Sequence, residues 1–180
     1  MTAGAEGRAG DHRLEVVAAR CLEDLRRARQ TLATAESLTA GLVCATLAAV
    51  PGASDVLRGG LAAYATDVKS SVLGVDPAVI ATHGAVSSEC AAGMALRAVE
   101  LFGADWAVSA TGVAGPDPQE GKPPGTVFIA VAGPRDVHVQ RLSLSGTRDE
   151  IRRASVLEVL SRLASTVERP PTPAGSGDDG

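Results

Sequence analysis

Short apolar runs rich in β-prone residues alternate along this chain with longer segments that have the periodicity of an amphipathic helix. Strands are predicted at 31–35, 58–65, 105–111, 126–132 and 137–144. Helices are predicted at about 12–29, from 37–39 to 49, from 66 to 74, from 77 onward, at 88–102 and from 147 to 167. Helices separate the first three strands, a Gly/Pro-rich loop leads to the fourth, and a hairpin turn joins the last pair. We therefore expect an α/β fold: a three-layer α/β/α sandwich with a mixed central sheet.

Several helix boundaries carry their own signals. Asp76 before Pro77 is typical of an N-cap followed by proline at the first helical position. Ser87 is predicted to cap the helix at 88–102, and Thr147-Arg-Asp-Glu150 has the pattern of a capping box. In the last strand the apolar positions change parity near Arg141, which predicts a β-bulge.

The length and the composition suit one globular domain. The chain has 180 residues, of which 45% are hydrophobic, enough for one substantial core. Residues 1–11 are small and polar, and residues 169–180 are rich in Pro, Gly and Asp, so both ends are predicted to be flexible tails around a domain at 12–168.

Composition also argues against several classes of function. Aromatic residues make up 2% of the chain and the net charge is −4, which disfavours nucleic-acid binding. Cys21, Cys44 and Cys90 lack paired spacing and are interpreted as buried thiols, and no histidine has ligand spacing, so no metal is expected. Neither a signal peptide nor a membrane span is recognisable, so we expect a cytoplasmic protein that does not associate with membranes.

Three side chains lie at predicted junctions between strands and helices and could form an acylation site without histidine. Ser37 is placed where a strand turns into a helix, near unpaired amides that could hold an oxyanion. Lys69, early in the helix from Thr66, is disfavoured as a cation by the helix dipole and could act as a general base. Tyr64 precedes it. The alternatives are an N-cap for Ser37, a solvated surface position for Lys69 and a core-edge position for Tyr64.

Other features add a binding surface. The Gly/Pro-rich loop at 111–125 leaves the end of a strand, where ligands of open α/β sheets bind, and Lys122 could meet an anion. Arg148 occupies a first helical turn, a poor place for a cation unless it faces an anion, and Arg152 could share that role or be solvated. A short-chain dehydrogenase is set aside, because Tyr64 and Lys69 are five residues apart rather than four and no Gly-x-Gly-x-x-Gly loop follows the first strand.

Taken together, these motifs resemble the CinA C-terminal domain family over about residues 14–167. They are Ala-Glu-Ser-x-Thr-x-Gly at 35–41, Tyr-x4-Lys at 64–69, His-Gly-Ala-Val-Ser at 83–87, Gly-x-Ala-Gly-Pro at 112–116, Lys-Pro-x-Gly at 122–125 and Gly-x-Arg at 146–148. That family includes stand-alone nicotinamide-nucleotide amidohydrolases.

The resemblance implies hydrolysis of the carboxamide of nicotinamide mononucleotide to the acid and ammonia, in pyridine-nucleotide salvage, without a cofactor. It implies Ser37 as the nucleophile, Lys69 as its base and Tyr64 as an assisting hydroxyl. The substrate-binding residues it implies are Thr39, Gly41, Thr66, Thr111, Gly112 and Arg148, with Gly41 allowing close approach to the oxyanion amides. A homo-oligomer, dimer or higher, is a further expectation from the family.

The chain departs from the family pattern at three places. Ala40 stands before Gly41 where the family has Gly-Gly, which predicts a narrower pocket; Thr66 replaces an Asn; and Asp117-Pro-Gln-Glu120 replaces a more glycine-rich stretch. Two alternatives stay open: a non-catalytic module that binds a nucleotide or a protein partner, and an amidase for another small amide.

Overall fold

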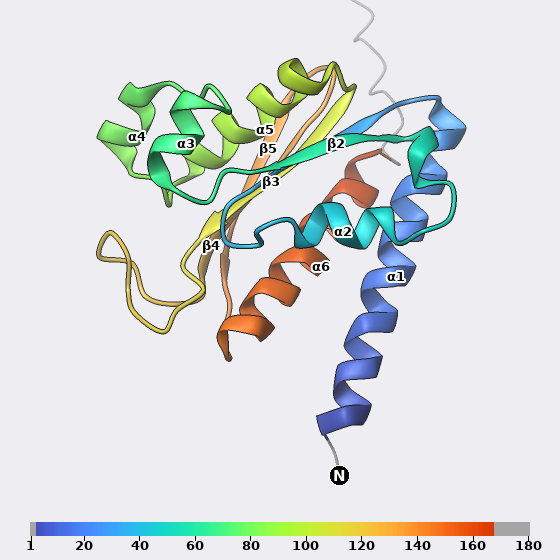
Figure 1. Ribbon diagram of the computed structural model, residues 1–180, viewed down its shortest axis with the longest axis horizontal. Coiled ribbons are helices and arrows are strands. Elements are labelled where there is room, and N and C mark those ends of the chain that lie inside the picture. The colour runs from blue at the N-terminus through green and yellow to red at the C-terminus, as the bar shows by residue number, and fades with distance from the viewer. Residues whose placement is uncertain (1–2, 168–180) are drawn as a thin grey trace, which may run out of the picture.

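The computed structural model describes residues 3–167, with side chains from Gly10 onward. The elements, in chain order, are α1 (Ala3–Ala28), β1 (Leu32–Glu36), α2 (Leu42–Ala48), the 3-10 turn η1 (Ala53–Asp55), β2 (Leu57–Ala62), α3 (Thr66–Ser71), α4 (Pro77–His83), α5 (Ser88–Phe102), β3 (Trp106–Gly112), β4 (Thr126–Ala132), β5 (Val137–Ser143) and α6 (Arg148–Val167). Figure 1 shows the strands as a twisted sheet with helices on both sides. The predicted α/β sandwich is confirmed.

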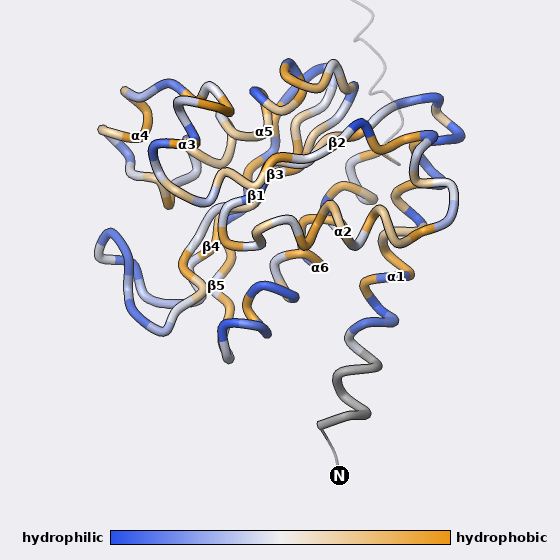
Figure 2. The backbone as a smooth tube through the Cα atoms, in the orientation of Figure 1, coloured by the Kyte–Doolittle hydropathy of each residue, from blue (hydrophilic) through white to orange (hydrophobic). Residues whose placement is uncertain are grey.

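The sheet is mixed and has the strand order β2-β1-β3-β4-β5. β1 pairs in parallel with both β2 and β3, whereas β3-β4 and β4-β5 are antiparallel. α1, α2 and α6 bury one face of the sheet around Leu25, Ile129 and Leu160. α5 covers the other face around Ala35 and Met94. In Figure 2 the strands carry mainly apolar or neutral colours, while the β3-β4 loop and the first turn of α6 are hydrophilic.

The connections that leave β1 and β2 run over opposite faces of the sheet. α2 joins β1 to β2 on the face of α1 and α6, and α5 leads from β2 to β3 on the other face. Neighbouring strands β1 and β2 therefore send their chains to opposite faces of the sheet at their carboxyl ends. In open α/β sheets such a switch point leaves a crevice where ligands bind.

The first helix begins earlier than its periodicity predicted. α1 is helical from Ala3 rather than from residue 12, so the segment 3–11 is not an irregular tail. Alanine, glutamate and arginine are good helix formers, and extending an existing helix costs far less than starting one. The predicted tail at 169–180, and residues 1–2, lie outside the described residues.

The predicted bulge near Arg141 is wrong. The β4-β5 register runs without a shift from Thr126 opposite Ser143 to Ala132 opposite Val137. The parity changes because the two ends of β5 are covered on opposite faces. Val137 and Val139 pack against α5, whereas Leu142 belongs to the core beneath α6.

The other boundary signals hold. Asp76 accepts a hydrogen bond from the amide of Ala78, and Ser87 accepts one from Cys90 at the start of α5. In the capping box, Glu150 accepts from the amide and hydroxyl of Thr147. β2 ends at Ala62, earlier than the predicted 65, so Tyr64 lies beyond the strand.

Candidate active site

Ser37 lies directly after β1, at the crevice where the chains leaving β1 and β2 diverge. Its backbone amide donates to the carbonyl of Ala110 in β3 at 2.9 Å, so the sheet fixes the position of its Cα. The residue is buried, and its hydroxyl has no hydrogen-bond partner among the described residues. A serine hydroxyl in a fixed position and without a partner is free to donate its proton to a base and to attack a substrate.

The chain after Ser37 does not enter a helix at once, as the sequence pattern predicted. It makes a turn, and α2 begins at Leu42. The buried carboxylate of Glu36 accepts hydrogen bonds from the amides of Val43 and Cys44, at 3.0 and 2.8 Å. Glu36 thus occupies amides at the start of α2 that were expected to hold an oxyanion, so that role cannot be theirs.

Lys69 is almost completely buried, with 2% of its surface exposed. Its Nζ donates to the carbonyls of Ala63 at 3.0 Å and Tyr64 at 3.3 Å. Burial lowers the pKa of Lys69, although the nearby acidic groups of Cys90 and Glu120 oppose the shift. The pKa is lowered by desolvation, and not by the helix dipole to which the sequence pattern had pointed. The cap of α3 is Ala65, and Thr66, predicted as the cap, is the first residue of the helix.

The hydrogen bonds of Lys69 suit a neutral amine. A neutral amine has two N–H donors, and two carbonyls accept from it here, which leaves its lone pair available for a proton. The sequence-based prediction of a base at this position therefore has a specific geometry behind it. The solvated surface lysine that was the alternative is excluded by the burial.

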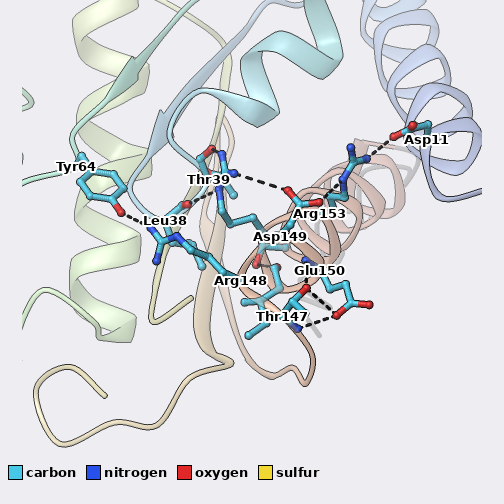
Figure 3. Close-up of polar contacts among 12 residues, drawn as sticks. Asp11, Leu38, Thr39, Tyr64, Thr147, Arg148, Asp149, Glu150 and Arg153 are labelled. Atoms are coloured by element: carbon cyan, nitrogen blue, oxygen red, sulfur yellow. Dashed lines mark hydrogen bonds and ion pairs between the residues drawn. The ribbon is translucent and has the colours of Figure 1, made fainter. Parts of the chain in front are cut away.

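Tyr64 and Arg148 meet at the outer end of the site, as Figure 3 shows. Arg148, the first residue of α6, donates through Nη2 to the Tyr64 hydroxyl and through Nη1 to the carbonyl of Gly115 at 2.7 Å. Three segments far apart in the sequence are joined here. A guanidinium has five N–H groups, so donors remain for an anionic ligand.

Most of the predicted residues line one cavity of about 320 Å³. They are Ser37, Tyr64, Thr66, Lys69, Thr111, Gly112 and Arg148. Thr111 uses its hydroxyl to bond the carbonyl of Ala85, which ties the end of β3 to the segment before α5. The structure does not bring Thr39 or Gly41 to the cavity wall, and the Thr39 side chain is fully buried.

Glu120 has a role that the sequence pattern did not reveal. It reaches from the β3-β4 loop to the amides of Ala85 and Val86, at 2.9 and 3.0 Å, and Lys122 lies 3.8 Å from it. Ala85 and Val86 line the cavity, so this carboxylate fixes part of its wall. No local motif marks such a contact, because its partners are backbone groups 34 and 35 residues away.

Comparison with known proteins decides the family. The model of the CinA C-terminal domain matches residues 14–167, most of the chain. The chain belongs to the CinA C-terminal domain family. A CinA-like protein of Frankia casuarinae is 49% identical over 130 residues, which cover 72% of this chain and 30% of that protein. The chain spans about a third of the length of the curated relatives it matches.

Solved structures of CinA proteins have the same fold. The competence/damage inducible protein CihA from Agrobacterium tumefaciens superposes with a TM-score of 0.83 at 33% identity, covering 87% of this chain and 96% of that one. The competence damage-inducible protein A from Klebsiella pneumoniae gives the same TM-score at 29% identity, covering 86% and 96%.

The substitution of Ala40 within this CinA domain affects the backbone and not the cavity. Ala40 is exposed, does not line the cavity, and has a φ of 51°. The prediction of a narrower pocket is therefore wrong. A left-handed conformation costs a residue with a Cβ about 1–2 kcal/mol, which glycine does not incur. The turn after Ser37 is consequently strained.

None of the three cysteines of the CinA domain lines the cavity. Burial raises the pKa of Cys21 to about 12 and of Cys90 to about 11, so both are protonated thiols at neutral pH, and Cys44 is half-buried. Among the described residues, no group of three or more His, Cys, Asp or Glu side chains could hold a metal ion. None of the described helices has the length and apolar character needed to cross a bilayer.

Replacing Ala40 by Gly should stabilise the protein. Removing the Cβ relieves the left-handed strain, and the greater freedom of glycine in the unfolded chain offsets part of the gain, so the free energy of unfolding should rise by about 0.5–1 kcal/mol. Urea unfolding measures the change. Ala45→Gly, at an exposed position in right-handed α2, is the matched control and should lose about 1 kcal/mol. Equal losses in both variants would contradict the strain.

Replacing Lys69 by Met should change how stability depends on pH. Because the pKa of Lys69 lies below its ordinary value of 10.5 in the folded protein, the unfolded chain binds more protons at pH values between the two. The free energy of unfolding of the wild type should therefore rise with pH through that window, relative to Lys69→Met. Urea unfolding from neutral to alkaline pH tests this, with Lys122→Met as the control for loss of a lysine. A constant difference between wild type and Lys69→Met would contradict the lowered pKa.

Proposed function

We propose that this CinA domain hydrolyses the carboxamide of nicotinamide mononucleotide to the acid and ammonia. The observation that carries the proposal is that Ser37 and the buried amine of Lys69 line one cavity, which also contains the guanidinium of Arg148. Hydrolysis of a carboxamide in a molecule that also carries a phosphate calls for a nucleophile, a base and an anion-binding group. The likeness to CinA proteins supports the same assignment.

In the first half of the proposed reaction, Ser37 attacks the amide. Neutral Lys69 takes the hydroxyl proton as the bond from Ser37 Oγ to the carboxamide carbon forms. The tetrahedral intermediate then collapses, the C–N bond breaks, and Lys69 returns the proton to the departing nitrogen, which leaves as ammonia. The product of this half is an ester on Ser37.

In the second half, water hydrolyses that ester. Lys69, neutral again, removes a proton from water, which attacks the acyl carbon. The nicotinate nucleotide leaves, and Lys69 gives its proton back to Ser37 Oγ. A base with a lowered pKa suits both halves, because more of it is unprotonated at a given pH than of an ordinary lysine.

Arg148 is proposed to bind the phosphate. Its guanidinium is held by Gly115 and Tyr64 at the outer part of the cavity, and its remaining N–H donors suit phosphate oxygens. Thr66 is proposed to assist with its hydroxyl, and Gly112 to let the backbone approach the ligand. Tyr64 would take part in proton transfer once phosphate replaces its hydroxyl on Arg148.

The purified protein should release ammonia from nicotinamide mononucleotide, and its Ser37→Ala variant should not, because no nucleophile remains. A coupled ammonia assay measures this. Ser165→Ala is the matched control, since Ser165 is exposed on α6 and bonds within its own helix. If wild type releases no ammonia yet binds the nucleotide, a non-catalytic binding module replaces the proposal. Ammonia release from another small amide instead would change the substrate.

Replacing Arg148 by Gln should weaken recognition of the phosphate more than the chemistry. We expect KM for nicotinamide mononucleotide to rise by about tenfold or more, the equivalent of losing a charge-assisted hydrogen bond of about 1.5–3 kcal/mol. With nicotinamide riboside, which has no phosphate, the change in KM should be small. The two substrates are compared in steady-state kinetics, and equal effects on both would place the phosphate elsewhere.

A further inference from the structure

We propose that Arg152 is a positioning residue for the nucleophile turn, defined as residues 37–40, and that it fixes the backbone amide of Leu38 as the donor to the oxyanion. This inference rests on the proposed function, because it assigns a group to the same acylation chemistry. By its sequence context alone, Arg152 is either an anion ligand or a solvated residue. The structure gives it a different set of partners.

Arg152 binds backbone carbonyls on both of the residues that follow the nucleophile-bearing one. From the second turn of α6, its Nε donates to the carbonyl of Leu38 at 3.1 Å and its Nη2 to that of Thr39 at 2.9 Å. The carboxylate of Asp149 is farther away, at 3.9 Å from Nη1. One rigid, planar group therefore holds two successive peptide units, which a flexible ammonium could not do with the same geometry.

The nucleophile turn needs such a restraint. It contains the left-handed Ala40, and strained backbone persists only where the surrounding structure holds it in place. Within the turn itself, the amide of Ala40 donates to Ser37 O, and the carbonyl of Thr39 also accepts from Leu42. The carbonyl of Leu38 has Arg152 as its hydrogen-bond donor among the described residues. Arg152 thus ties the middle of the turn to α6.

Among the backbone amides around the nucleophile, that of Leu38 is the one available as a donor to the oxyanion. The amides of Val43 and Cys44 belong to Glu36, and that of Ser37 belongs to Ala110. Within the described part of the chain, the amides of residues 38, 39 and 41 have no acceptor, and of these residues Leu38 is the one that lines the cavity. The amide next after a nucleophile is also the one that a sharp strand-to-turn junction presents to an oxyanion.

The test measures the reactivity of Ser37 with a small fluorophosphonate, which phosphonylates an activated serine with loss of fluoride and does not need the natural substrate. We compare wild type, Arg152→Gln, Arg152→Lys and Arg153→Gln by intact-mass spectrometry. Arg153 is the matched control: it is the next residue of the same helix, and its partners are the surface carboxylates of Asp11 and Asp149. Figure 3 shows Arg153 directed toward Asp11, away from Leu38. Thermal melting gives the folded fraction of each variant.

Removing one oxyanion donor from an enzyme typically costs about 10²–10³-fold in rate, so its misplacement should slow labelling in Arg152→Gln by about 10–100-fold per folded molecule. Arg152→Lys should fall in between, because it keeps one hydrogen bond, and Arg153→Gln should match wild type. With nicotinamide mononucleotide, kcat should fall by the same factor while KM changes less than about twofold, since the defect lies in the transition state.

The outcomes separate the two proposals. If wild type is labelled at Ser37 but Arg152→Gln is labelled equally fast, the positioning role is wrong and the serine chemistry stands. A rise in KM with unchanged kcat would also overturn it, because Arg152 would then be a ligand of the substrate. If wild type neither reacts at Ser37 nor releases ammonia, the proposed function fails, and the role of Arg152 fails with it.

Discussion

The architecture depends on β1 being hydrogen-bonded on both sides and buried on both faces. All five of its residues are buried, and it pairs in parallel with β2 and β3. Two parallel neighbours require two crossover connections, and these run over opposite faces of the sheet, so the chains that leave the carboxyl ends of β1 and β2 diverge. The crevice that holds Ser37 is a consequence of that topology.

Two buried ionisable side chains near the carboxyl end of this strand, Glu36 and Lys69, have different roles. Glu36 satisfies two amides of α2 and the hydroxyl of Thr34, which is a structural use of charge. Lys69 has two carbonyl partners and no carboxylate bonded to it, so burial shifts its pKa downward. Several donors satisfy the carboxyl group of Glu36 where it is buried, whereas desolvation disfavours the charged form of the Lys69 amine.

Several features could be predicted from the sequence because their causes are local. The cap at Ser87, the capping box at Thr147 and the strand at 126–132 are each determined by residues within a few positions of one another. The bulge at Arg141 was wrong for the opposite reason. Its parity change reflects different helices over the two ends of β5, and nothing local to that strand tells which helix covers which end.

The same difference between local and distant causes explains which residues of the site could be predicted. Ser37, Tyr64, Lys69 and Arg148 were named from motifs at element junctions, and the structure places them around one cavity. Glu120 and Arg152 were missed or misinterpreted because both bind backbone groups of distant segments. Side-chain contacts with the main chain leave no complementary residue in the sequence to reveal them.

By itself, the sequence determined the order and type of the elements, most of their caps and the set of reactive side chains, since hydrophobic periodicity and capping act over one or two turns. The tertiary structure alone decided which amides remain unpaired near Ser37, how deeply Lys69 is buried and what Arg152 holds. The desolvation of a group and the supply of hydrogen-bond partners to it depend on all the residues packed around it, and those residues come from distant parts of the chain.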